Sequence, residues 1–379
     1  MKITAIHVWA LTLPLNKPYW LSGGRLKFSE LDSTFVRIDA EDGDRRISGF
    51  GEACPWGNSY LPAHAAGVRA GVQTLAPALL GMNALAPENI NRRMDETLPG
   101  HPYAKAALDI ACWDILGKFT NMPLWQCLGG ASAAAVALNS SISTNAPQTM
   151  IEDIQHASAA GYRIHSAKIG GSDAATDIAR INAIEPVRQQ LGEKVTYDIN
   201  RAWTPSVAVE VLNSVAARGW IEQPCETLAQ CAQVAARVPQ PIMLDECLHT
   251  AADFYEAHRL NAGEGCKLKP NRVGGITKAR FLRDYAISIG WCMHIEDVGG
   301  SAFADTVAIH LAASTPETQR LASWLCHAHL AVDPVSGQGV RNRSDNLGYA
   351  IPPSTPGVGV VPDETQLGTP VASYRSASP

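Results

Sequence analysis

Short apolar runs alternate with longer amphipathic stretches through the middle of the chain, and most of these runs end in an ionisable residue. VTYDIN, GWIEQP, IMLDE and CKLKP carry Asp198, Glu222, Asp245 and Lys269, which lie 24, 23 and 24 residues apart. This spacing fits one strand, one helix and two short loops per step. The pattern therefore predicts a (β/α) barrel, with a site where the carboxyl ends of the strands meet.

The first 60 residues follow a different pattern. ITAIHVWALTL, STFVRIDAEDG and ISGFGEACP alternate apolar and polar positions, which predicts a three-stranded meander with a hairpin turn at residues 42–44. The intervening NKPYWLSGGRLK, with paired glycines, is expected to be a mobile loop. Helical periodicity follows at about 62–80, 87–96 and 103–118. These elements predict an α+β unit.

The change of rhythm near Gly129 sets the domain boundaries. A chain of 379 residues with 46% hydrophobic content is long enough for a barrel and a second, smaller domain. We predict an α+β domain over 1–128 and a barrel over 129–332, with RLASWLC as its last strand. The Gly- and Pro-rich segment 333–379 is expected to return to the first domain.

Composition narrows the function to small-molecule chemistry. The net charge is only −5, and no block of Lys and Arg points to nucleic acid or an anionic membrane surface. No apolar run is long enough to span a membrane, and the amino terminus alternates as a strand rather than as a signal peptide. Nine cysteines without a CxxC pair indicate reduced thiols, which favours the cytoplasm.

Three carboxylates at consecutive strand ends predict a metal site. Asp198, Glu222 and Asp245 would repel one another strongly unless a divalent cation lay among them. Oxygen ligands without His or Cys suit Mg²⁺. A single acid at a strand end more often caps a helix, so the prediction depends on three in register. Asn200 and Glu246 are close enough in sequence to be auxiliary ligands or supporting groups.

Several segments carry a family resemblance as a set: GFGEACP, AKAALDIACWDILGK, YDINRAW, WIEQP, LDE and KPNRVGGITKA, with a weaker TPGVGVVPDE near the end. Together they resemble the enolase superfamily, in particular its muconate lactonizing enzyme subgroup. The resemblance spans nearly the whole chain. It implies a (β/α)7β barrel under an α+β capping domain, which the carboxyl-terminal segment completes. It also implies Mg²⁺ held by Asp198, Glu222 and Asp245, two bases, Lys168 and Lys269, a carboxylate substrate and a homo-oligomer.

The chemistry of such sites is removal of a proton next to a carboxylate, through an enediolate that the metal stabilises. A lysine that acts as the base must be neutral, so its pKa has to be lowered by burial or by nearby positive charge. Lys168 on the second strand and Lys269 on the sixth are predicted to face each other across the substrate. The alternative is that each lysine forms a salt bridge to the metal-binding carboxylates.

One position departs from the family pattern of Lys-x-Lys on the second strand, because this chain has Ser166 before Lys168. Ser166 and Lys168 point to the same face of the strand, so the site lacks a cation beside its base. Lys267 shares a barrel layer with Ser166, and we hypothesise that it supplies the missing charge from the opposite wall. The alternative is that Lys267 leans outward at the start of its strand.

The seventh strand offers further candidates. His294 is a rival base by analogy with mandelate racemase relatives, although those pair it with an Asp where this chain has Lys269. Asp297 either caps the next helix or pairs with an ammonium group of the substrate, as the resemblance to proline-derivative epimerases implies. Its neighbour Glu296 is added as a candidate substrate-binding residue.

Aromatic residues complete the predicted pocket. They are expected to wall a cationic substrate by cation–π contact, although each alone is more typical of a core. The candidates are Trp324 on the last strand and Tyr19, Trp20, Trp56 and Tyr60 in the capping loops.

Three functional interpretations remain open. The first is a dehydratase or epimerase of a proline-like amino acid such as cis-3-hydroxy-L-proline or a hydroxyproline betaine. The second is a muconate-type cycloisomerase, a dipeptide or N-acyl amino acid epimerase, or an acid-sugar dehydratase. The third is a non-catalytic binding barrel, against which lysines at both base positions argue. Asp297 favours the first interpretation over an anionic or neutral substrate.

Overall fold

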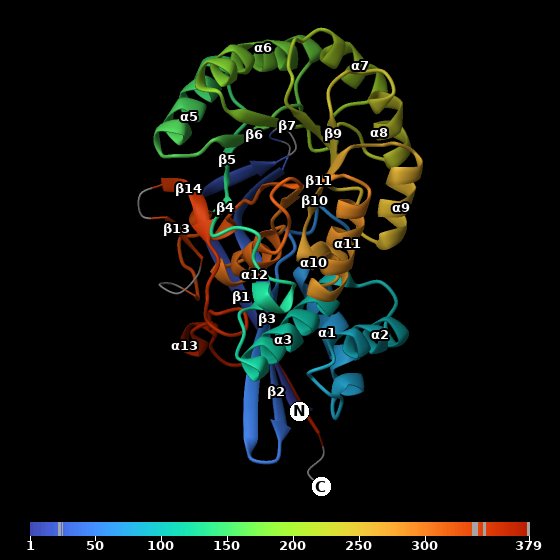
Figure 1. Cartoon of the computed structure of the whole chain (residues 1–379), viewed down its shortest axis with the longest axis vertical. Coiled ribbons are helices and arrows are strands. Elements are labelled where there is room, and N and C mark those ends of the chain that lie inside the picture. Colours follow the sequence, from blue (N-terminus) through green and yellow to red (C-terminus); the bar gives the residue numbers. More distant parts are fainter. Residues whose placement is uncertain (22–23, 25, 336–339, 344–345, 377–379) are drawn as a thin grey trace.

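The computed structural model describes residues 1–21, 24, 26–335, 340–343 and 346–376. Figure 1 shows a barrel ringed by helices, with an antiparallel sheet and further helices packed at one end. The fold class is therefore as predicted, mixed α/β with a barrel and an amino-terminal α+β unit. Within the described residues, no helix is long and apolar enough to cross a lipid bilayer.

The amino-terminal unit is a four-stranded antiparallel sheet in the order β15-β1-β2-β3, with helices against it. Gly43, in the left-handed region at φ 58°, lies in the predicted turn between paired Asp42 and Arg45. The elements are β1 (Lys2–Leu21), β2 (Leu26–Asp42), β3 (Arg45–Ala53), α1 (Ala65–Leu79), α2 (Pro87–Thr97), α3 (Pro102–Thr120) and α4 (Leu124–Cys127).

The predicted loop between the first two strands is instead part of the sheet. Tyr19 pairs with Phe28 and Trp20 pairs with Lys27, so β1 and β2 run on as a long hairpin. The prediction of a loop was therefore wrong for the described residues, because aromatic and aliphatic side chains on the two arms suit a paired ribbon. The hairpin extends from the first domain to the barrel, which brings Tyr19 into the site.

Eight parallel strands form the barrel in the order β5 to β12, and a parallel bridge from Leu138 to Ser323 joins its two edges. The strands are β5 (Asn139–Ile142), β6 (Ile164–Lys168), β7 (Lys194–Asp198), β8 (Trp220–Glu222), β9 (Ile242–Leu244), β10 (Gly265–Leu268), β11 (Cys292–Ile295) and β12 (Arg320–Ala322). Its helices are α5 (Pro147–Ala159), α6 (Ala174–Leu191), α7 (Pro205–Asn213), α8 (Leu228–Ala235), α9 (Ala251–Arg259), α10 (Pro270–Val273), α11 (Ile276–Ser288) and α12 (Ala302–Ala313).

Local sequence explains where the barrel helices start. Thr227 and Thr250 begin α8 and α9 with capping boxes. Each threonine hydroxyl accepts a hydrogen bond from the backbone N–H of the third helical residue, and the side chain of that residue accepts one from the backbone N–H of the threonine. Thr204 caps α7, Pro205 is the first residue of the helix, and the helix ends at Asn213.

The last strand of the carboxyl-terminal segment lies against the first domain, and an earlier strand pairs with a strand just before the barrel. Its strand β15 (Ala372–Arg375) pairs antiparallel with β1, and β14 (Asn346–Ile351) pairs with β4 (Val136–Ala137) and β13 (Arg341–Arg343). The remaining elements are the 3-10 helix η1 (Cys326–His329) and α13 (Glu364–Leu367).

Buried carboxylates fasten the first domain to the barrel. Glu52, at the end of β3, accepts hydrogen bonds from the backbone N–H and the hydroxyl of Ser301 at 2.9 and 2.6 Å, at the start of α12. Asp109 on α3 likewise accepts from the N–H and the hydroxyl of Thr277 at the start of α11. Carboxylates at helix amino termini satisfy free N–H groups and complement the helix dipole.

Replacing Glu52 is expected to loosen this junction. Glu52→Ala removes the acceptor for buried donors of Ser33, Ser301 and Ala304 and should destabilise the fold by roughly 3 kcal/mol. Chemical denaturation measures the loss, with Glu30→Ala, at an exposed position of β2, as the control. Equal stability of the two variants would contradict the proposed fastening.

Candidate active site

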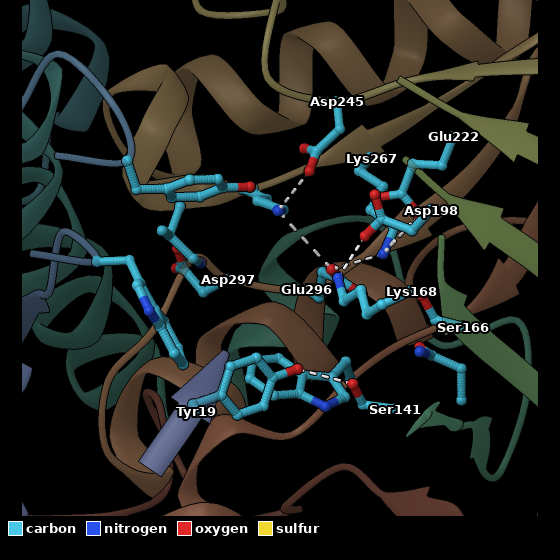
Figure 2. A pocket seen from close by; sticks show the side chains of 16 residues that line it. Tyr19, Ser141, Ser166, Lys168, Asp198, Glu222, Asp245, Lys267, Glu296 and Asp297 are labelled. Atoms are coloured by element: carbon cyan, nitrogen blue, oxygen red, sulfur yellow. Dashed lines mark hydrogen bonds and ion pairs between the residues drawn. The ribbon is translucent and has the colours of Figure 1, made fainter. Parts of the chain in front are cut away.

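The barrel strands place the predicted ionisable residues around one pocket. Lys168, Asp198 and Glu222 are the last residues of β6, β7 and β8 and lie in register, each beside the next. Asp245 and Lys269 directly follow β9 and β10. All five line the pocket, as Figure 2 shows for those it labels. Consecutive strand ends of a parallel barrel converge on its carboxyl-terminal face, which is why a spacing of about 24 residues brought these side chains together.

Both predicted base lysines are paired with predicted metal ligands. The Lys168 ammonium contacts Asp198, and the Lys269 ammonium lies 2.8 Å from Asp245, which Arg272 also contacts. Burial alone would lower the pKa of Lys168, but Asp198, Tyr19 and Glu222 together outweigh burial and raise that pKa. Burial would raise the pKa of Asp245, but Arg272 and Lys269 hold it well below its usual range. The salt-bridge alternative thus describes the arrangement seen here.

Lys267 points into the pocket rather than outward. Its ammonium lies 3.2 Å from Glu222 and 3.0 Å from Glu296, and its side chain is buried. Burial alone would lower the pKa of Lys267, but Glu222 and Glu296 raise it. Its positive charge is therefore inside the site, as the compensation hypothesis requires, and Glu296 contributes to holding it there.

The donor set fits a divalent cation. Among the described residues, no three acidic, His or Cys side chains are already arranged as a metal cluster, since each of the three carboxylates faces a cationic side chain. Both carboxylate oxygens of Glu222 are nevertheless buried without a hydrogen-bond partner. Burial, with the charges of Asp198 and Asp245, raises the pKa of Glu222 well above its ordinary value. A hard cation held by these three oxygen donors would compensate that crowding of negative charge.

The two auxiliary candidates lie together beside the predicted ligands. Glu246 accepts hydrogen bonds from Asn200 Nδ2 at 3.1 Å and from the Tyr60 hydroxyl at 3.0 Å, while Asn200 N–H donates to Asp198. Burial, with the charges of Asp245 and Asp198, raises the pKa of Glu246 to about 7. These contacts position Asp198 and close one side of the pocket with Tyr60.

Four of the five predicted aromatic residues line the pocket. The rings of Tyr19 and Trp56 lie 5.1 Å apart, and Trp324 lies 6.1 Å from each. Tyr60 lines the same pocket. Trp20 was predicted wrongly, because successive residues of a strand point to opposite faces. Its side chain is 47% exposed, with the Lys27 ammonium over its ring.

Asp297 is a buried acid within the pocket. Its carboxylate accepts hydrogen bonds from Asn271 Nδ2 and Val298 N–H, both at 2.8 Å, and no ion pair to it occurs within the described part of the chain. Burial is the main reason that its pKa is raised to about 8. It does not cap α12, whose N-cap is Ser301, so the capping alternative was wrong.

His294 does not take part in the described pocket. It is buried on β11, and burial, with the charge of Lys267, lowers its pKa well below the ordinary value. It is not among the described residues that line the pocket. The two lysines remain the candidates for bases.

Sequence reasoning missed polar residues on the first barrel strand. Asn139 and Ser141 line the pocket beside Ser166, and the Ser141 hydroxyl lies 2.7 Å from the Tyr19 hydroxyl. The signal was available, because alternate residues of a barrel strand face inward and ALNSSIS places Asn139 and Ser141 two apart. Arg272 was also missed, although KPNRVGG contains it.

Comparison with known proteins places both halves of the chain in one family. Residues 149–366 match the family model described as enolase C-terminal domain-like. Residues 6–129 match the amino-terminal domain of mandelate racemase / muconate lactonizing enzyme. The two matches follow the division between the capping unit and the barrel.

Individual relatives agree over most of their length. The chain is 39% identical to the cis-3-hydroxy-L-proline dehydratase of Roseibium aggregatum, over 99% of this chain and 100% of that protein. It is 31% identical to the N-succinyl-L-Arg/Lys racemase of Bacillus cereus, over 83% of this chain and 85% of that protein. A crystal structure of an enolase superfamily member from Roseovarius nubinhibens, complexed with magnesium, is 61% identical with a TM-score of 0.94, covering 99% of this chain and 100% of that one.

Proposed function

The chain is an enzyme of the mandelate racemase / muconate lactonizing enzyme family in the enolase superfamily, and from this membership we propose that it dehydrates cis-3-hydroxy-L-proline to a pyrroline-2-carboxylate. The relative from Roseibium aggregatum carries the corresponding name. The proposal also includes epimerisation at the α-carbon as a second outcome of the same proton removal.

Asp297 is the observation that carries the choice of substrate. A buried carboxylate without a cationic partner in the described structure is costly unless a ligand brings positive charge. An amino acid ring with a secondary ammonium supplies it, and Trp56 and Trp324 provide aromatic walls beside that charge. A muconate or an acid sugar has no group for Asp297, which is why cycloisomerisation and acid-sugar dehydration are less well supported.

Asp198, Glu222 and Asp245 would hold Mg²⁺, which would stabilise the negative charge that develops on the substrate carboxylate. Lys267 and Arg272 keep the surrounding carboxylates compensated. Tyr19 and Trp56, brought over the barrel by the first domain, limit the access of water.

Lys168 and Lys269 come from strands on different sides of the barrel and act on the two faces of the substrate ring. In cis-3-hydroxy-L-proline the α-hydrogen and the 3-hydroxyl lie on opposite faces. One lysine therefore removes the α-proton while the other protonates the leaving oxygen. The same pair exchanges the α-proton between faces when the substrate has no 3-hydroxyl, which is epimerisation.

The cytoplasmic location and the homo-oligomer remain predictions.

Turnover of hydroxyprolines in D₂O tests the function directly. We expect the purified protein with Mg²⁺ to convert cis-3-hydroxy-L-proline to Δ1-pyrroline-2-carboxylate, with deuterium at the α-carbon of recovered substrate or epimer. Lys168→Ala and Lys269→Ala should each reduce dehydration by at least about 10³-fold, but one should retain α-exchange of one enantiomer. Proton NMR measures both reactions.

Two results would count against this assignment. If proline betaines are epimerised and 3-hydroxyprolines lose no water, the protein is an epimerase and the proposed dehydratase activity is wrong. Retention of exchange from both faces in both lysine variants would show that neither lysine is the base.

Mg²⁺ is expected to be required. Asp245→Asn removes one of three charged ligands and should weaken Mg²⁺ binding by at least about tenfold and abolish turnover. Titration calorimetry measures the binding, with Asp284→Asn, exposed on α11, as the control. Full activity of the parent protein in excess chelator would contradict the predicted requirement for Mg²⁺.

The pH dependence of cation binding tests Asp297. Burial, together with the carboxylates of Asp305 and Glu52, raises its pKa to about 8, so it is neutral below that pH and ionised above it. Proline betaine, whose ammonium charge is fixed, should bind about tenfold more tightly at pH 9 than at pH 6.5. Calorimetry measures both affinities. The Asp297→Asn protein should bind weakly at both values, and an unchanged dependence would remove the ammonium role.

A further inference from the structure

A set of neutral polar side chains lines the pocket on the side of Lys168. Asn139 and Ser141 of β5 and Ser166 of β6 all face the pocket, and Ser141 lies in register beside Ser166. Figure 2 shows Ser141 and Ser166 on the same side of the pocket as Lys168, with Asp297 across from them. None of the three side chains carries a charge.

Two of these side chains have buried polar atoms without a partner in the described structure. Asn139 is 3% exposed and Ser166 is 2% exposed, and neither Asn139 Oδ1 nor Ser166 Oγ makes a hydrogen bond. An unsatisfied buried polar atom costs about 1–3 kcal/mol, so such atoms in a pocket indicate a ligand group that completes them. The Ser141 hydroxyl, by contrast, is already bonded to Tyr19.

The chemistry of the unpartnered atoms selects the group that fits. A serine hydroxyl donates and accepts, and an asparagine amide offers an acceptor or, when turned over, a donor. A carboxylate only accepts, and an ammonium only donates and is better served by Asp297. A hydroxyl group both donates and accepts, so of these three groups it is the one that satisfies Ser166 and Asn139 together in either orientation of the amide.

We propose that Asn139 and Ser166 form a subsite for the ring hydroxyl that the substrate loses. This inference rests on the proposed function and extends it to the recognition of the leaving group. It also explains the serine at position 166, because a lysine there would fill the space and bring a charge that a neutral hydroxyl does not need.

The subsite assigns the two lysines to the two faces. Ser166 is two residues before Lys168 on the same face of β6, so the leaving oxygen lies on the side of Lys168. Lys269 then takes the α-proton, the C2–C3 double bond forms as the C3–O bond breaks, and Lys168 gives the departing hydroxide a proton to form water. The enamine product tautomerises to the cyclic imine, and no oxidant or reductant is involved.

Two substrates that differ only in the hydroxyl test the subsite. Ser166→Ala and Asn139→Ala should lower kcat/KM for dehydration of cis-3-hydroxy-L-proline about tenfold each, the loss expected for one hydrogen bond. Both variants should exchange the α-proton of L-proline in D₂O within about twofold of the parent. If the parent exchanges L-proline too slowly to measure, its inhibition constant as a competitive ligand replaces the exchange rate.

Ser323→Ala is the matched control. Its hydroxyl is also buried and unpartnered, on the neighbouring strand end, but Ser323 is not among the described residues that line the pocket. It should behave as the parent with both substrates. Equal losses with L-proline and with the hydroxyproline, or no loss with either, would overturn the subsite alone. A parent that neither transforms nor binds these amino acids would overturn the proposed function and the subsite with it.

Discussion

Mutual compensation of buried charges is the constraint on which the site depends. Four carboxylates and four cations are linked by ion pairs at the carboxyl ends of the strands: Asp198, Glu222, Asp245, Glu296, Lys168, Lys267, Lys269 and Arg272. Removing one partner of a buried pair leaves an uncompensated charge that costs several kcal/mol. The charge of each residue therefore limits which charges its neighbours can carry. A ligand that binds here has to keep the positive and negative charges of the site balanced.

Hydrogen bonds at the junction between the domains help to hold the first domain over this cluster. Glu52 and Asp109 tie the first domain to the amino termini of α12 and α11, so the long hairpin of β1 and β2 is fixed relative to the barrel. Tyr19 reaches the pocket from that hairpin. The charged side chains beneath this cover are largely buried, and burial strengthens the electrostatic interactions between them.

Much of the barrel and its charged residues could be predicted, because the repeat length of the strands and the positions of the ionisable residues coincide there. From Asp198 to Lys269 a strand end recurs every 23 or 24 residues, and an acid or a lysine marks each of these ends. The hairpin around Trp20 was not predictable in the same way, because its glycines indicate a loop while its pairing depends on contacts made after folding. Asn139 and Ser141 were overlooked although strand alternation turns both toward the barrel interior, because uncharged residues do not by themselves indicate chemistry at a strand end.

The serine at position 166 connects the charge balance with substrate choice. A lysine there would add a fifth cation to a cluster in which Lys267 already faces Glu222 and Glu296 from another strand. With the charge supplied from that side, the wall beside Lys168 is free to be neutral and polar. A neutral wall opposite the acid Asp297 gives the pocket two chemically different ends, which we propose receive the hydroxyl and the ammonium group of the substrate. In the proposed reaction, that asymmetry determines which face of a hydroxylated ring meets which lysine, so the stereochemistry we propose depends on the neutral wall as much as on the two lysines.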